Sequence, residues 1–340
     1  MVTDMPSKLK LLQQPKTENA KKMFAAQQDR AELLRPLNQT IAEGALAAFV
    51  PLFWEIGNLK RTKPANIEIS FATQLFLQAW QEIAGGVSPK IVAIKIASRA
   101  VAAAQLGAID AEALNKAGLS RTDIQIILER SFDLSASPIS EDLRSELRAN
   151  LFFENKQNLP DAPDFAQKLA GQPRSGATKQ GAPRLVFDAP ENHAEHCITV
   201  AVYAVLLAPL FDAAIETVFL MALTHHFHNA YLPDAGFAGE ELLGEFLPKI
   251  FQNLRQKCLS QLPESLHASV RQTFALTERA DASESKAFHA ADVIDRVLQM
   301  RHHAEANGFT LKYALEEMEL VHAGAVQSFH YQVLREAKLI

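Results

Sequence analysis

Apolar residues recur every three to four positions along most of this chain, which is the spacing of one helix face. Residues 41–59, 71–83 and 285–303 are clear examples, and Pro51 is expected to bend or split the first of them. No segment of useful length alternates between apolar and polar residues as a half-buried strand would. The periodicity therefore predicts an all-α protein. Further helices are predicted at residues 88–106, 124–132, 140–153, 213–227, 241–259, 266–278 and 312–337.

The composition is that of a folded globular protein. The chain has 340 residues, of which 48% are hydrophobic and 21% charged, enough for two ordinary domains or one large one. A net charge of −5 argues against a nucleic-acid polymer as partner. The two cysteines, Cys197 and Cys258, form no CxxC pair, which excludes a disulfide scaffold and a zinc ribbon and fits the reducing cytoplasm. The N-terminus has no apolar signal region, and the longest apolar run, 197–211, is shorter than the roughly 20 residues of a membrane span. We therefore expect a cytoplasmic protein that does not bind a membrane.

A segment rich in proline and glycine, residues 157–183, divides the chain. It is predicted to be a loop or linker between a helical N-terminal domain, residues 1–156, and a second helical domain, residues 184–340. Residues 1–30 are polar and predicted to be a loose arm or a surface helix. The N-terminal half shows no cluster of histidine, cysteine, aspartate or glutamate at catalytic spacing.

The second half opens with a helix start signal. Asp188 is predicted to be the N-cap, with Pro190 in the first turn and Glu191 at the capping-box position. The predicted helix carries His193 and His196 into an apolar run and should be buried in the centre of its domain.

Three histidines gather at the end of the next predicted helix. His225, His226 and His228 lie within four residues, directly after the apolar run 218–223. On a helix His225 and His228 share a face, and His226 points about 100° away. A single buried histidine is more often a hydrogen-bonded core residue, but three at this spacing predict a metal site.

Two further residues extend this cluster. His225 follows His196 by 29 residues and Asp292 follows His225 by 67, which is too long for a zinc finger and fits a site assembled in a helical bundle. Asp292 and Asp295 flank the apolar stripe of their helix, where a carboxylate is costly to bury unless it is paired or bound to a cation. Asp295 lies nearer the stripe, but Asp292 is the first choice as ligand. Imidazoles and a carboxylate suit a divalent transition metal.

Three short motifs resemble those of the HD metal-dependent phosphohydrolase superfamily, whose all-α domains carry the order His, His-Asp, Asp. Residues 191–197 (ENHAEHC) are similar to the ENxxEHS motif of its nucleotidase-like branch. Residues 222–226 (ALTHH) are similar to its A-[LM]-x-H-D motif, and residues 291–295 (ADVID) to its closing A-D motif. The resemblance covers about residues 184–305 and implies an HD-type helical domain there. It does not reach the N-terminal half, for which the periodicity predicts a second helical domain.

The resemblance implies that His196, His225 and Asp292 are metal ligands and that His228 is not. The sequence departs from the family at His226, which stands where the family has aspartate. An imidazole can still bind a metal, but the site loses a negative charge. The loss of charge weakens the binding of a hard ion such as Mg²⁺ and favours the binding of Mn, Fe, Ni, Co or Zn.

A second departure is Asn229, which stands where the nucleotidase-like branch has a proton-handling glutamate. An amide cannot act as a general acid or base, so Asp234, at an acidic position of that branch, is the remaining candidate base. Lys179, Arg184 and Arg296 are the candidate phosphate-binding residues.

These residues favour a metal-dependent hydrolase that acts on a nucleotide or another phosphate ester, so a small phosphorylated molecule is the expected partner. One alternative is a degenerate regulatory or scaffolding HD protein whose partner surface is the N-terminal half. Another is an HD-fold iron oxygenase, a branch with extra histidines before the last aspartate; His267 and His289 are present, but at spacings that do not match. The formation of a homo-oligomer is left open.

Overall fold

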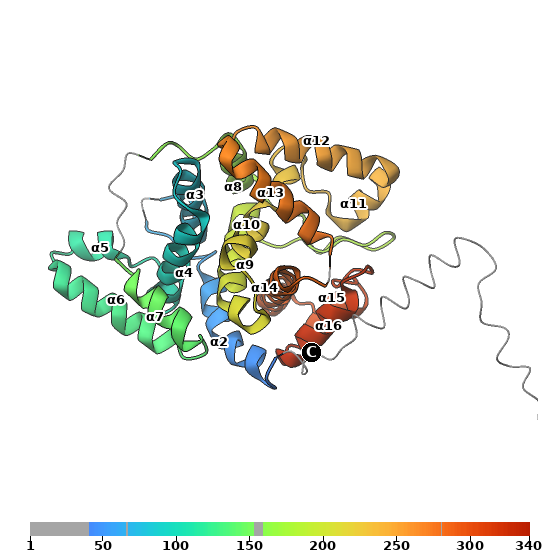
Figure 1. The fold of residues 1–340 in the computed structure, drawn as a ribbon. Helices are drawn as coiled ribbons and strands as arrows, with labels where there is room; N and C mark the ends of the chain where they lie inside the picture. Colours follow the sequence, from blue (N-terminus) through green and yellow to red (C-terminus); the bar gives the residue numbers. More distant parts are fainter. Residues whose placement is uncertain (1–40, 66, 153–158, 280) are drawn as a thin grey trace, which may run out of the picture.

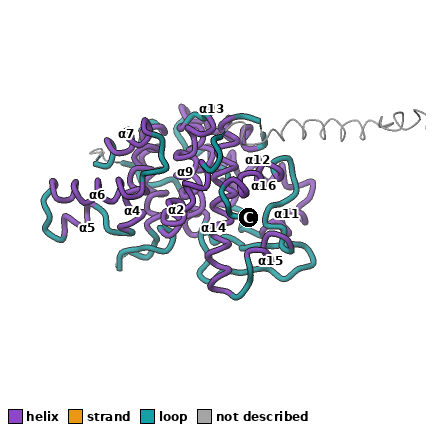
Figure 2. Tube along the Cα trace, turned by 90° about the horizontal axis from the view of Figure 1, so that it is seen from below, coloured by secondary structure: helices purple, strands orange, loops and turns teal. Residues whose placement is uncertain are grey.

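The chain folds into helices joined by loops (Figure 1). The computed structural model describes residues 41–65, 67–152, 159–279 and 281–340. Within these residues there is no strand, only two isolated bridges, and Figure 2 shows helix and loop throughout. The all-α prediction is confirmed. The predicted arm at residues 1–30 lies outside the described residues.

The first half contributes helices whose ends follow local capping signals. They are α2 (Ala45–Asn58), α3 (Phe71–Ala84), α4 (Pro89–Leu106), α5 (Ala111–Lys116), α6 (Arg121–Ser135) and α7 (Glu141–Ala149). The predicted capping box before α6 is present, since the Ser120 side chain accepts the Asp123 N–H and Asp123 accepts the Ser120 N–H. Pro51 lies inside α2, which continues through it as one helix.

The second half contains the remaining helices. They are α8 (Asp164–Gly171), α9 (His193–Leu207), η2 (Ala208–Phe211), α10 (Ile215–Thr224), η3 (Phe227–Ala230), α11 (Gly236–Leu243), η4 (Gly244–Phe246), α12 (Leu247–Leu259), α13 (Glu264–Thr277), α14 (Ser283–Asn307), α15 (Leu311–Glu316) and α16 (Gln327–Glu336).

The start of α9 differs from the prediction. The helix begins after Asn192, not after Asp188, because the Asn192 side chain accepts the Glu195 N–H while Glu195 accepts the Asn192 N–H. This second capping box, four residues farther along, satisfies two N–H groups that the helix leaves free.

The single helix predicted at 241–259 is broken at Gly244 into parts of α11, η4 and α12. Two further segments differ from prediction for a common reason. The predicted linker contains helix α8, whose residues Phe165 and Leu169 are buried in the core. The single helix predicted at 312–337 is two helices, α15 and α16, because the intervening Met318 and Leu320 turn into the core. In each case the burial of apolar side chains outweighs the local loop or helix signal.

Helix α9 lies at the centre of the molecule, with all of its residues buried. It packs against α10, α14, α3 and α4. The helical stretch His193–Phe211 is long and apolar enough to cross a membrane, but 89% of its apolar window is buried inside the protein. This burial is typical of the core helix of a folded domain.

One hydrophobic core runs through both halves of the chain. Phe53 of α2 stacks on Tyr203 of α9, and Trp80 of α3 contacts Phe227 of η3. The division into two domains stays a prediction, but the N-terminal helices pack directly against the helices that carry the histidines.

Candidate metal centre

His196 lies on the first turn of α9, where its ring is fully buried. Its Nδ1 is 2.8 Å from Oδ2 of Asp295 on α14. A carboxylate only accepts hydrogen bonds, so this contact places the ring proton on Nδ1. The lone pair of Nε2 therefore points away from Asp295, toward α10.

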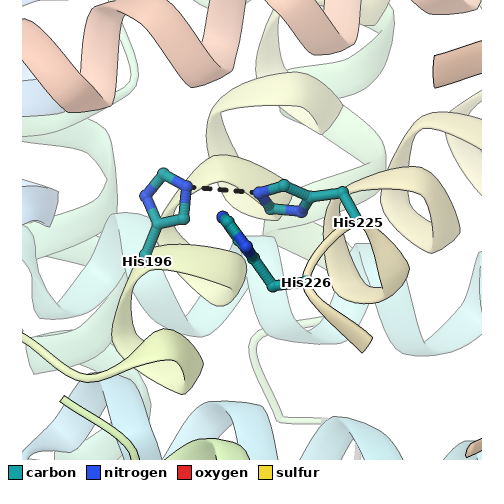
Figure 3. Close-up of side chains that lie close together, drawn as sticks. All are labelled: His196, His225 and His226. Carbon is teal, nitrogen blue, oxygen red and sulfur yellow. Dashed lines mark hydrogen bonds between the residues drawn. The ribbon is translucent and has the colours of Figure 1, made fainter. Parts of the chain in front are cut away.

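His225 ends α10 and faces His196. Its Nδ1 is 2.6 Å from the carbonyl oxygen of Ala222, so this ring also carries its proton on Nδ1. The two Nε2 atoms are 3.2 Å apart (Figure 3). Burial and the neighbouring His196 lower the pKa of His225 well below 6.5, so the ring is neutral. When both rings are neutral, two lone pairs face each other, an arrangement that a metal ion or a proton between them would relieve.

The third ring belongs to His226 and lies between the other two (Figure 3). Its Nδ1 is 2.9 Å from Oδ1 of Asn229, and the Asn229 amide nitrogen faces the Leu232 carbonyl oxygen at 3.4 Å. The amide orientation makes Asn229 the acceptor, so His226 too presents a bare Nε2. One nitrogen from each of His196, His225 and His226 lies within 4.8 Å of the others.

Asp292 adds a carboxylate to the three imidazoles. Its Oδ1 lies 3.2 Å from His196 Nε2 and has no hydrogen-bond donor, although it is buried. Its Oδ2 accepts a hydrogen bond from Arg296 at 2.7 Å. Burial disfavours the carboxylate form, but Arg296 and His196 outweigh it and hold the pKa of Asp292 well below its usual range.

The distances from His196 fit a shared divalent ion, although Asp292 is not among the three residues whose ligand atoms all lie within 4.8 Å of one another. Two ligands each about 2.1 Å from one ion at the tetrahedral angle lie about 3.4 Å apart. The observed separations of 3.2 Å, for His196 to His225 and for His196 to Asp292, are close to this value. A buried oxygen without a donor and buried nitrogens without a proton to share both indicate a cation. Three imidazoles and one carboxylate suit the ions predicted from the sequence, Mn, Fe, Co, Ni or Zn.

Comparison with known proteins agrees with this reading. Residues 166–330 match the family model of the HD domain. This part of the chain is an HD domain. A search of curated proteins and a search of solved structures each gave no match. The family points to the superfamily of metal-dependent hydrolases, and HD domains typically bind divalent metals.

A second group of acidic residues lies behind His196 in the HD domain. Glu191, His196 and Asp295 bring their ligand atoms within 4.8 Å of one another. The ammonium of Lys60 already occupies this cage, since its Nζ is 2.8 Å from Glu191 Oε2 and 2.7 Å from Asp295 Oδ1. The place of a second cation is therefore taken by a side chain of the protein.

A cavity of about 190 Å³ adjoins the histidines. His226 forms part of its wall, with Asp234 and two cationic residues, Arg174 and Arg296. Arg174 donates to Glu191, and Arg296 donates to Asp292 and to the Leu320 carbonyl. Each guanidinium has five N–H donors and uses only some of them in these contacts. The cavity therefore presents further N–H donors beside the three imidazoles.

The predicted phosphate-binding residues separate into two groups. Arg296 lines the cavity. Lys179 instead pairs with Glu319 at 2.7 Å, and Arg184 donates to the carbonyl of Ala235 at 3.2 Å; neither is part of the cavity wall. The structure thus brings one of the three to the metal centre.

The predicted base, Asp234, lies at the cavity and is held by the backbone. Its Oδ2 accepts the Ser175 N–H at 2.9 Å and its Oδ1 the Gly236 N–H at 2.8 Å. His193, whose two ring nitrogens are buried without hydrogen-bond partners, points Nε2 at Asp234 Oδ2 from 3.6 Å. Asp234 is therefore fixed in place beside His226 and keeps free lone pairs.

The other histidines lie outside the cluster. His228 stacks on Phe251, with ring centroids 3.8 Å apart, and is not among the clustered nitrogens of the described residues. That it is not a ligand stays a prediction. His267 and His289 each contact a backbone carbonyl, of Leu262 and Thr277 respectively. Neither belongs to the clustered nitrogens among the described residues, so the histidines considered for an oxygenase do not enlarge this centre.

Three residues that surround the candidate site were not predicted from the sequence to belong to it. Glu191 stands in a motif quoted above, so its position carried a signal. Lys60 and Arg174 carried none, because no local pattern links them to residues more than a hundred positions away or across a loop. Asp295, considered as a ligand, instead accepts a hydrogen bond from Nδ1 of His196, on the side of the ring opposite Nε2.

Proposed function

We propose that this protein is a metal-dependent hydrolase of small phosphate esters, with one divalent ion held by His196, His225, His226 and Asp292. The observation that carries the proposal is the convergence of the three imidazoles and the unpartnered Asp292 Oδ1 next to a cavity. The wall of this cavity contains Arg174 and Arg296 as well as three carboxylates, those of Glu191, Asp234 and Glu240. A bound divalent ion would polarise a phosphoryl oxygen and lower the pKa of a bound water.

The residues around the ion have separate roles in this proposal. Arg174 and Arg296 bind the phosphoryl oxygens through their remaining N–H groups. Asp234, held by two backbone N–H groups, accepts a hydrogen bond from the attacking water and orients it. The cavity of about 190 Å³ is below the roughly 300–1,000 Å³ of ordinary ligand sites, so it favours a small ester or only the phosphoryl end of a larger one.

A regulatory metal-binding module is the second candidate, and Asn229 favours it. The Asn229 amide contacts the His226 ring and the Leu232 carbonyl oxygen, and an amide cannot transfer a proton. If catalysis has been lost, the centre would bind a metal without hydrolysing any ester, and the N-terminal half would supply the surface for a partner.

Phosphate release separates the two candidates. Wild type and His226→Asp are assayed on a panel of phosphate esters and nucleotides with Mn²⁺, Co²⁺, Ni²⁺, Fe²⁺ and Mg²⁺. The hydrolase proposal expects release by wild type with at least one transition metal, and a shift of metal preference toward Mn²⁺ or Mg²⁺ in His226→Asp, which restores a negative charge. Metal binding without release by either protein in every metal would favour the regulatory module.

A further inference from the structure

The side chain of Lys60 reaches the metal centre from outside the HD domain. It follows α2, more than one hundred residues before the part of the chain that matches the family model. Its side chain is 2% exposed, and Nζ contacts Glu191 at 2.8 Å and both oxygens of Asp295 at 2.7 and 2.9 Å. These three contacts to carboxylate oxygens, made inside the protein, hold the ammonium in one position.

Asp295 links this ammonium to the metal-binding face of His196. Its Oδ2 accepts hydrogen bonds from both Lys60 Nζ and His196 Nδ1. The hydrogen bond from Nδ1 decides which way the ring faces and which nitrogen keeps a lone pair. Whatever holds Asp295 in place therefore acts on Nε2 of His196 on the opposite side of the ring.

The backbone around Lys60 is anchored on both sides. The Lys60 N–H donates to the Gly57 carbonyl at 3.3 Å, and the next residue, Arg61, donates to Gln299 of α14 at 2.6 Å. The Ala72 N–H of α3 donates to the Leu59 carbonyl at 3.2 Å. The α2–α3 connection is thereby fastened to α14, the helix that carries Asp292 and Asp295.

We propose that Lys60 is a positioning residue of the metal centre: its ammonium fills the carboxylate cage of Glu191 and Asp295 and so fixes Asp295 as the acceptor that orients His196. The N-terminal half then contributes a side chain that determines the orientation of His196. Without the ammonium, two buried carboxylates would face each other, and Asp295 would turn away or draw another cation or proton. This inference rests on the proposed metal centre.

The first test measures the affinity of the full-length protein for Zn²⁺ and Mn²⁺ by competition with a chelator. Lys60→Met is expected to weaken both affinities by about 10- to 100-fold, as for other partners of metal-binding histidines. Lys95→Met is the matched control, because Lys95 also forms a buried ion pair, with Glu82 at 2.6 Å, in the N-terminal half. It is expected to lower thermal stability but leave metal affinity unchanged.

A double-mutant cycle shows whether Lys60 acts through Asp295. Asp295→Asn alone should weaken metal binding, and adding Lys60→Met to it should weaken binding no further, because the acceptor that Lys60 holds is already altered. Fully additive losses would overturn the proposal.

Lys60→Gln is the second variant if Lys60→Met does not fold, since its amide can still donate to one carboxylate. Its readout is the ¹⁵N spectrum of the His196 ring in the metal-free protein, where loss of the single Nδ1–H form is expected. Retention of that form together with wild-type metal affinity would overturn the proposal. Failure of wild type itself to bind Zn²⁺ or Mn²⁺ would instead contradict the proposed metal centre.

Discussion

His196 and His225 face each other through Nε2 atoms that are 3.2 Å apart, while the Nδ1 of each ring is hydrogen-bonded in the opposite direction. Asp295 and the carbonyl of Ala222 accept the two Nδ1 protons, so a proton can bridge the Nε2 atoms only where one ring is an imidazolium. A protein gains nothing from two buried lone pairs at this distance unless a cation joins them. The orientation of the rings therefore supports the proposed metal site.

The first prediction concerns the ligands. His225→Ala should lose most of the metal that copurifies with wild type, because it removes one of the facing nitrogens. His228→Ala should keep it, since His228 stacks on Phe251 away from the cluster. Elemental analysis of both variants, purified without added metal, measures this. Equal metal content in wild type and His225→Ala would refute the assignment.

The second prediction concerns Asn229. Asn229→Leu removes the acceptor for His226 Nδ1 at similar volume, and should weaken transition-metal affinity by about 10- to 100-fold. Asn229→Asp is the matched control, because it keeps an acceptor oxygen at the same position and should retain the affinity. Chelator competition with Zn²⁺ measures both. If the leucine variant bound as tightly as wild type, His226 would not depend on Asn229 for its orientation.

The third prediction concerns anion binding. Arg296→Met should weaken the binding of inorganic phosphate to the metal-loaded protein by tenfold or more, since a hydrogen bond to a charged group contributes about 1.5–3 kcal/mol. Lys179→Met should have no effect, because Lys179 pairs with Glu319 outside the cavity wall. Isothermal titration of phosphate into each variant, with metal content confirmed, provides the measurement. Equal weakening in both variants would contradict the placement of the site.

The fourth prediction concerns pH. Burial, with Arg255 nearby, lowers the pKa of His228 to about 3, against 6.5 for the unfolded chain. The unfolded state therefore binds the proton first, so this stability is full above about pH 6.5 and is lost as the pH falls toward 3. At pH 5, His228 alone should cost about 2 kcal/mol.

Chemical denaturation between pH 7.5 and 4.5, with a chelator present, tests this. His228→Phe should reduce the slope of the free energy of unfolding against pH by about one proton. Phe251→Leu disturbs the same stack without removing a titratable group and should keep the slope. An unchanged slope in His228→Phe would show that His228 does not contribute to the pH dependence.

The helices could be predicted because their signals are local. Apolar spacing located α3, α4 and α14 to within a few residues, and the Ser120 capping box marked the start of α6. The errors occurred where distant contacts outweighed local signals. Helix α8 forms in a segment rich in proline and glycine because Phe165 and Leu169 are buried against the core.

The sequence by itself determined which side chains could bind a metal and which helices carry them. His196, His225, His226 and Asp292 are brought to one place by helices α9, α10 and α14, whose apolar faces pack together. Their assignment as ligands stays a prediction, which the geometry supports.

Only the tertiary structure decided how these side chains are oriented. Lys60 meets Glu191 across 131 residues and Asp295 across 235, and His196 meets Asp295 across 99. The ring proton of each histidine goes to whichever acceptor the packed helices place beside Nδ1, and no sequence period carries that information. Periodicity decides which face of a helix is buried, but the hydrogen bonds among buried groups depend on which faces meet.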